Sequence, residues 1–185
     1  MVMYRLITLF VCIFLCSCYA TKRLPDGTKV LSKKYKNIDK FDPFIYSQID
    51  PNYFYKQVEV YKTGKSYKDV MGYWRGPSSR RLQFYDGGYI RILVDNQKES
   101  PDPDLSGKRG IIYMKNQDIR IDRDTADQDG TLQKQTLKVI VKGDKIYLVE
   151  RLFGMSWGWS SNPMCYVFQK AEKVPEEWKQ YKPDW

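Results

Sequence analysis

Histidine is absent from this chain of 185 residues. The base that most serine and cysteine hydrolases use to activate their nucleophile is therefore missing, as is the commonest metal ligand of proteins. Ser–His and Cys–His catalysis and all histidine-ligated metal sites are excluded. Carboxylate pairs could still hydrolyse glycosides, but no pair stands out in the sequence. We therefore expect a protein that is not an enzyme and has no catalytic residues, no metal and no cofactor.

Cysteine is scarce and poorly placed for disulfide bonds. Three of the four cysteines, Cys12, Cys16 and Cys18, lie within the first 18 residues. The fourth, Cys165, lies in the apolar run 164–168, where a lone cysteine usually behaves as a small buried hydrophobe. If the chain is cleaved before Cys18 and that residue carries lipid, Cys165 has no partner for an intramolecular disulfide.

Long apolar runs are also missing. The apolar stretch Leu6–Leu15 has ten residues and follows a single positive charge at Arg5. At 1.5 Å per residue, a helix of this length cannot cross a hydrocarbon layer of about 30 Å. The stretch therefore predicts an N-terminal leader rather than a stable membrane span.

The leader ends in Leu15-Cys16-Ser17-Cys18, which resembles a bacterial lipobox with an off-consensus Cys16. The resemblance implies a signal peptide over residues 1–17 and a mature chain anchored in the lipid bilayer through acylated Cys18. More than one acyl chain on that cysteine would anchor the protein durably. The alternative is an ordinary secretory signal with an incidental Cys18.

Positive charge is in excess, with 31 Lys and Arg against 22 Asp and Glu and a net charge of +9. Behind a leader, nucleic acid becomes the least expected partner of a basic surface, and we predict none. Residues 18–40 hold seven of these cations against two aspartates, which predicts a basic tether. The tether would be attracted to anionic headgroups or would simply be solvated. The absence of acids just after Cys18 favours an outer-membrane protein that faces the periplasm.

From residue 41 to residue 185, the composition predicts one aromatic-rich all-β domain. Alternation indicates strands over 54–60, 71–74 and 164–169. Three turns, 86–88, 116–117 and 143–144, predict three hairpins whose apolar residues fall on one face. The predicted pairs are Leu82–Ile92, Phe84–Ile90, Met114–Ile119, Ile112–Ile121, Val141–Ile146 and Val139–Leu148. The segment 174–182, with Pro175 first, acids early and lysines late, predicts a short C-terminal helix.

Three loops carry candidate binding residues. The acidic loop 122–130 fails the spacing of a calcium-binding EF-hand loop, because Ala126 and Asp127 stand where a ligand and a glycine are needed. Arg75, Arg80 and Arg81 could hold a phosphate or carboxylate, or could form a solvated loop. Trp157 and Trp159 could stack on a sugar ring or an acyl chain, or could plug one end of the barrel.

The chain from Gly72 onward is similar to the small lipocalin-like lipoproteins of Bacteroidetes. The similarity rests on the segments 82–88, 111–114, 143–148 and 165–168, and weakly on Gly72-Tyr73-Trp74. It implies an antiparallel meander that closes into a small lipocalin-like up-and-down barrel. Two functions remain open: a binding module for an apolar or glycan ligand, or an accessory lipoprotein that docks onto an envelope complex.

Overall fold

The computed structural model describes residues 21–32, 34–64, 66–75, 78–94, 99–126, 130–150 and 163–185, which form an all-β protein. The strands of these residues are β1 (Thr21–Arg23), β2 (Lys29–Leu31), β3 (Tyr53–Thr63), β4 (Val70–Arg75), β5 (Arg80–Phe84), β6 (Tyr89–Val94), β7 (Lys108–Lys115), β8 (Asp118–Ala126), β9 (Leu132–Lys142), β10 (Lys145–Glu150) and β11 (Met164–Lys173).

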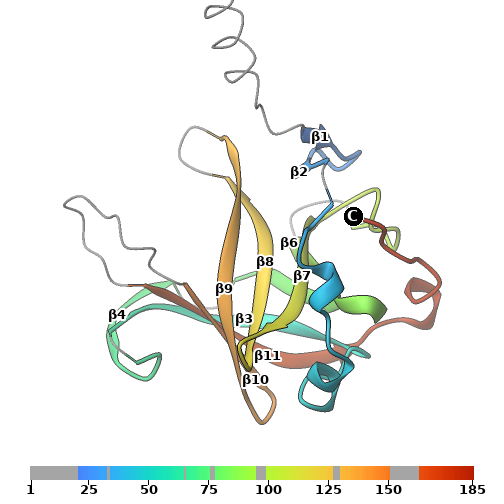
Figure 1. The fold of residues 1–185 in the computed structure, drawn as a ribbon. Coiled ribbons are helices and arrows are strands. Elements are labelled where there is room, and N and C mark those ends of the chain that lie inside the picture. The colour runs from blue at the N-terminus through green and yellow to red at the C-terminus, as the bar shows by residue number, and fades with distance from the viewer. Residues whose placement is uncertain are drawn as a thin grey trace, which may run out of the picture.

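Eight of these strands form a closed antiparallel barrel (Figure 1). Strands β5 to β11 follow one another as a meander, and β3 pairs with both β5 and β11 to close the barrel. The short strand β4 pairs only with β3, and the hairpin β1–β2 forms a separate two-stranded sheet. The predicted up-and-down barrel is therefore confirmed.

All three predicted hairpin registers are confirmed. The six observed pairs are Leu82–Ile92, Phe84–Ile90, Met114–Ile119, Ile112–Ile121, Val141–Ile146 and Val139–Leu148. Asn116 and Gln117 both have positive φ angles of 52° and 63°, as a two-residue type I′ turn requires. Since side chains alternate along a strand, these pairs direct one apolar face of each hairpin into the barrel.

The interior is packed with apolar side chains and is plugged at one end. The main core joins inward-facing residues of the barrel strands to Ile45 and Ile49, both fully buried. Ile45 lies in the 3-10 helix η2 (Pro43–Ser47), and Phe41 packs just before it. A side chain at Gly88 (φ +83°) would put its Cβ 2.5 Å from the Phe41 ring, so the plug needs glycine there. We call Phe41, Ile45 and Ile49 the plug, and we call the end of the barrel that they fill the closed end.

The predicted C-terminal helix is reduced to one 3-10 turn, η4 (Glu176–Trp178). Two tryptophans near the C-terminus pack against the barrel at two separate places. Trp178 packs edge-on against Phe54, with ring centroids 5.5 Å apart. The Trp185 indole donates a hydrogen bond of 3.0 Å to the Gly110 carbonyl. An extended segment reaches both sites, whereas a continuous helix with one apolar face would present both rings to the same place.

The segment expected to be a tether packs onto the barrel from Leu24 onward. Leu24, Val30, Leu31 and Tyr35 are 0–8% exposed, although the segment is basic. Lys34, Lys36 and Lys40 are exposed, while the segment's few apolar side chains pack over the outer face of the barrel, where β2 contacts β7 and β9. We call residues 24–41 the strap. It continues through the 3-10 helix η1 (Ile38–Lys40) to the plug at the closed end.

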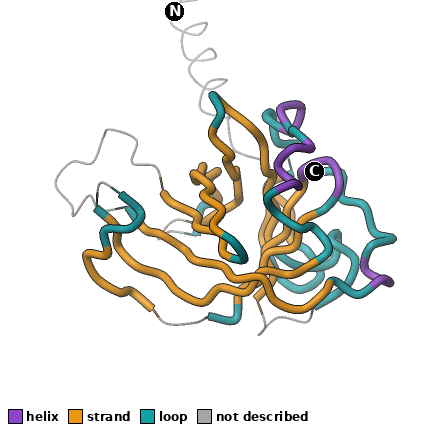
Figure 2. Tube along the Cα trace, turned by 90° about the horizontal axis from the view of Figure 1, so that it is seen from below, coloured by secondary structure: helices purple, strands orange, loops and turns teal. Residues whose placement is uncertain are grey.

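The short helical turns gather on one side of the molecule, near the C-terminus (Figure 2). Each spans three to five residues. Within the described ranges, no helix combines the length and apolar character that a membrane crossing needs.

Candidate ligand-binding site at the open end of the barrel

The two ends of the barrel differ in what fills them. The three tight turns and the plug lie at the closed end. At the opposite end, which we call the open end, β5 begins at Arg80, β6 ends at Val94 and β7 begins at Lys108. A cavity of about 200 Å³ lies here. Its lining consists of Arg80, Ile92, Val94, Lys108, Arg123, Asp124, Thr125 and Tyr166.

Strand alternation places three cations in this lining. Arg80 lies two residues before the inward-facing Leu82, and Arg123 lies two residues after the inward-facing Ile121. Lys108 pairs directly with inward-facing Ile92. The inward positions that are apolar through most of the barrel thus become basic at its open end.

Arg123 is the most deeply held of the three cations. It is 7% exposed, and its Nε donates a hydrogen bond of 2.9 Å to Gln135 Oε1. Its guanidinium lies 4.7 Å from the centroid of the Tyr166 ring, a cation–π distance. Burial lowers the pKa of Arg123, with Arg80 adding to the effect.

The carboxylate of Glu150 holds the residues that contact Arg123. Glu150 Oε1 accepts hydrogen bonds from the Tyr166 hydroxyl (2.8 Å) and from Gln135 Nε2 (2.9 Å). Glu150 Oε2 accepts one from the Met164 backbone N–H (3.2 Å). The network fixes the Tyr166 ring under the guanidinium of Arg123 and uses both oxygens of the acid.

Lys108 and Arg80 are held less firmly. Burial lowers the pKa of Lys108, and the positive charges of Arg80 and Arg123 lower it further. Neither Lys108 nor Arg80 forms an ion pair with any residue that the structure describes. The open end is therefore a half-buried concentration of positive charge.

Two of the three arginines predicted as a cluster, Arg80 and Arg81, point to opposite faces of β5. Arg80 points into the cavity, whereas its neighbour Arg81 points outward. Arg81 forms ion pairs with Glu99 and, at 2.7 Å, with Glu172. Its guanidinium also lies 4.8 Å from the centroid of the Phe54 ring. Arg81 thus connects β5 to acidic and aromatic residues on the outer wall of the barrel. The side chain of Arg75 lies outside what the structure describes.

Other predicted residues fall outside the described ranges or off the site. Trp157, Trp159 and the lipidation residue Cys18 lie outside the described residues. Cys165 is fully buried, as its apolar neighbours indicated, and burial raises the pKa of its thiol to about 11. Across the described ranges, no group of three potential metal ligands is present.

The acidic residues of the predicted loop that can be described are structural. Asp122 and Asp124 lie within β8 and are 0% and 1% exposed beneath the strap. Asp124 accepts hydrogen bonds from the Leu31 backbone N–H (3.0 Å) and from the Tyr35 hydroxyl. Asp122 accepts hydrogen bonds from strap and strand side chains. These acids clamp the strap to the outer wall of the barrel.

Sequence reasoning missed Lys108, Arg123 and Tyr166 as site residues. A signal for Arg123 was present, since alternation from Ile121 already directs it inward. The isolated position of Lys108 after a glycine gave no such signal, because the pairing of β6 with β7 spans a loop too long to fix a register.

The comparisons with known proteins add no further assignment: no family model matches the chain, and no match is found among curated proteins.

Proposed function

We propose that this protein is a lipid-anchored binding module of the bacterial envelope that holds a small ligand, or one end of a larger one, in the open end of its barrel. The observation that carries the proposal is the cavity of about 200 Å³ at the open end of the barrel, next to the packed apolar core. Small barrels of this architecture commonly bind ligands at the mouth.

The shape of the interior limits how the ligand enters. Ile92 lines the cavity floor and belongs to the packed core, which continues through Leu82 and Phe84 to the plug. An acyl chain could not pass through that core without displacing it. The apolar or glycan ligand expected from the sequence would therefore lie mostly outside the barrel, with one group inserted.

The test is to fill the cavity. Val94 is half-buried at the end of β6 and lines the cavity. Val94→Trp should abolish the binding of any fatty acid or envelope glycan that the wild-type chain binds. Binding is measured by chemical-shift changes in nuclear magnetic resonance spectra. Val70→Trp, at an exposed position outside the barrel, is the matched control. Equal binding by both variants would place the ligand elsewhere.

The proposed anchor has its own test. Cys18→Ser should leave the chain unprocessed or mislocalised, so that it no longer partitions into detergent as the mature lipoprotein does. An unchanged mature mass and unchanged membrane partitioning would contradict acylation. The proposed location, the outer membrane facing the periplasm, is tested by protease accessibility in intact cells.

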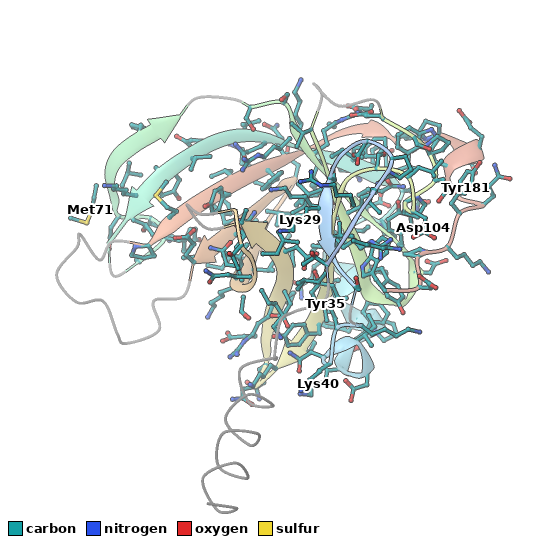
Figure 3. The ribbon with its side chains drawn as sticks, turned by 90° about the horizontal axis from the view of Figure 1, so that it is seen from above. Lys29, Tyr35, Lys40, Met71, Asp104 and Tyr181 are labelled. Atoms are coloured by element: carbon teal, nitrogen blue, oxygen red, sulfur yellow. The ribbon has the colours of Figure 1, made fainter. Side chains whose placement is uncertain are left out.

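A second candidate is an accessory lipoprotein that docks onto an envelope protein complex. The observation that favours it is an apolar patch outside the barrel on β4, where Val70, Met71 and Tyr73 are 45%, 61% and 71% exposed. Met71 lies at one edge of the molecule and Tyr181 at the opposite edge (Figure 3). A photo-crosslinker at position 73 should capture one envelope protein in cells under this candidate, and capture should survive Val94→Trp.

A further inference from the structure

Resting on the proposed binding function, we infer that the group inserted into the open end is an anion, a carboxylate or a phosphate, held by Arg80, Lys108 and Arg123. The inference names the chemical class of ligand and does not depend on whether the remainder of the ligand is an acyl chain or a sugar.

The first support is the cost of the charges as they stand. Burying a cation is unfavourable unless it is paired, and clustering like charges adds to the cost. Burial lowers the pKa of Lys108, and in the cavity lining Arg80 and Arg123 lower it further, against a smaller opposing effect of Asp124. A ligand anion between these cations would relieve that repulsion.

The second support is that the nearby acids are already engaged. Both oxygens of Glu150 accept hydrogen bonds from within the barrel wall. Asp124 contributes to the lining, but its carboxylate oxygens accept hydrogen bonds from the strap on the outer side. Asp124 raises the pKa of Lys108 and so offsets part of its charge, but neither acid forms an ion pair with Arg80 or Lys108 among the described residues. The described part of the site therefore retains positive charge that it does not balance itself.

The third support is the match between these groups and an anion. Arginine donates two parallel hydrogen bonds to a carboxylate or phosphate, and lysine adds a compact positive charge. The low-dielectric wall formed by Ile92 and Val94 strengthens such contacts relative to water. A cavity of about 200 Å³ holds one headgroup and leaves the remainder of the ligand outside.

The experiment compares anionic probes with neutral partners of the same shape. The full chain, in nonionic detergent, is titrated calorimetrically with hexanoate against hexanol, glucuronate against glucose, and inorganic phosphate alone. We expect at least one anion to bind and its neutral partner to bind at least tenfold more weakly. Hexanoate or glucuronate as the better probe identifies the acyl or the sugar source, and phosphate alone identifies a phosphoryl group.

Variants assign the binding to the cavity. Arg80→Gln and Lys108→Gln should each weaken binding of the anion at least tenfold. Arg81→Gln changes the neighbouring arginine on the opposite face, and it should change binding less than twofold. As a second readout, the anion should raise the pKa of Lys108, followed through its side-chain resonances, because a nearby negative charge favours the ammonium form.

The outcomes separate this inference from the function on which it rests. If neutral probes bind as well as anions and the Gln variants bind normally, the anion site is overturned while the binding module stands. If no probe of either kind binds, both are overturned. Equal losses in Arg80→Gln and Arg81→Gln would show a general effect of positive charge and would also overturn the site.

Discussion

Two sets of charged side chains are buried in this barrel, and the protein treats them differently. On the outer wall, each carboxylate oxygen of Asp122 and Asp124 accepts at least one hydrogen bond, and Asp122 also forms an ion pair with Lys134. At the open end, Lys108 and Arg80 lie beside another cation without an ion pair among the described residues. The acids that hold the strap are neutralised by the protein itself, whereas the cations of the cavity keep an excess of positive charge, which is the basis of the proposed anion site.

The largest expected effect is on the outer wall. Asp122→Ala removes the acceptor shared by the buried Tyr113 hydroxyl and by the partly buried Thr136 and Asn37 side chains. We expect a loss of about 3–5 kcal/mol in the free energy of unfolding, measured by urea titration. Asp39→Ala, an exposed acid of the same strap, should change it by less than about 0.5 kcal/mol.

A smaller loss should follow from removing one donor to the second acid. Tyr35→Phe keeps the buried ring but removes the hydroxyl that donates to Asp124. Hydrogen bonds to charged groups contribute about 1.5–3 kcal/mol, so we expect a loss in that range by urea titration. Tyr181→Phe changes a partly exposed tyrosine of the C-terminal segment and should be nearly neutral. Similar losses in both variants would mean that the hydrogen bond from Tyr35 to Asp124 makes no specific contribution to stability.

The stability that Tyr113 contributes on the outer wall should also decrease at high pH. Burial and then Asp122 raise the pKa of Tyr113 to about 12, above its ordinary value of 10.0. Since the folded pKa is the higher one, the stability from this group is complete below pH 10. It is lost as the pH rises toward 12.

Tyr113→Phe tests this dependence because phenylalanine does not titrate. At pH 7 the variant should be less stable by about 1.5 kcal/mol, the low end for a hydrogen bond to a charged group, because Asp122 keeps its other donors. The gap should narrow between pH 10 and pH 12, measured by urea titration at each pH. A constant gap would show that the Tyr113 hydroxyl is not protected by burial.

The smallest effect, and the one of opposite sign, is expected in the cavity. Lys108→Met removes a cation that its neighbours repel while keeping a side chain of similar length. The free energy of unfolding should rise by up to about 1 kcal/mol at pH 7, a modest gain because solvent screens the site. Lys138→Met, which removes an exposed lysine paired with Asp118, is the matched control and should not stabilise the fold. A clear loss in Lys108→Met would make this lysine structural and would remove the contrast.

Local features made much of the barrel predictable. A two- or three-residue turn fixes which residues face each other, so Val141 opposite Ile146 followed from Gly143-Asp144 alone. The strap was not predictable in the same way, because Tyr35 meets Asp124 across 89 residues of sequence. Its basic composition indicated a solvated tether, while four apolar residues decided where it packs.

The candidate site was predictable only in part for a similar reason. Alternation from Leu82 would direct Arg80 inward and Arg81 outward, but the sequence predicted a loop there, with both arginines in one cluster. Alternation from Ile121 would likewise direct Arg123 inward, but residues 122–130 were predicted to be a loop rather than part of a strand. The charge of the cavity comes from three strands, and only the closed barrel brings those strands together.

The hairpin β1–β2 has a consequence for the proposed membrane anchor. The hairpin β1–β2 is fixed beside the open end, where the Asp26 carboxylate accepts a hydrogen bond of 2.9 Å from the Gly107 backbone N–H. Gly107 directly precedes Lys108 of the cavity lining. If Cys18 carries the proposed acyl chains, only the residues between Cys18 and Thr21, where the hairpin begins, separate the anchor from the fixed hairpin. At about 3.4 Å per residue this distance is at most roughly 10 Å, so the open end would lie close to the headgroups of the bilayer.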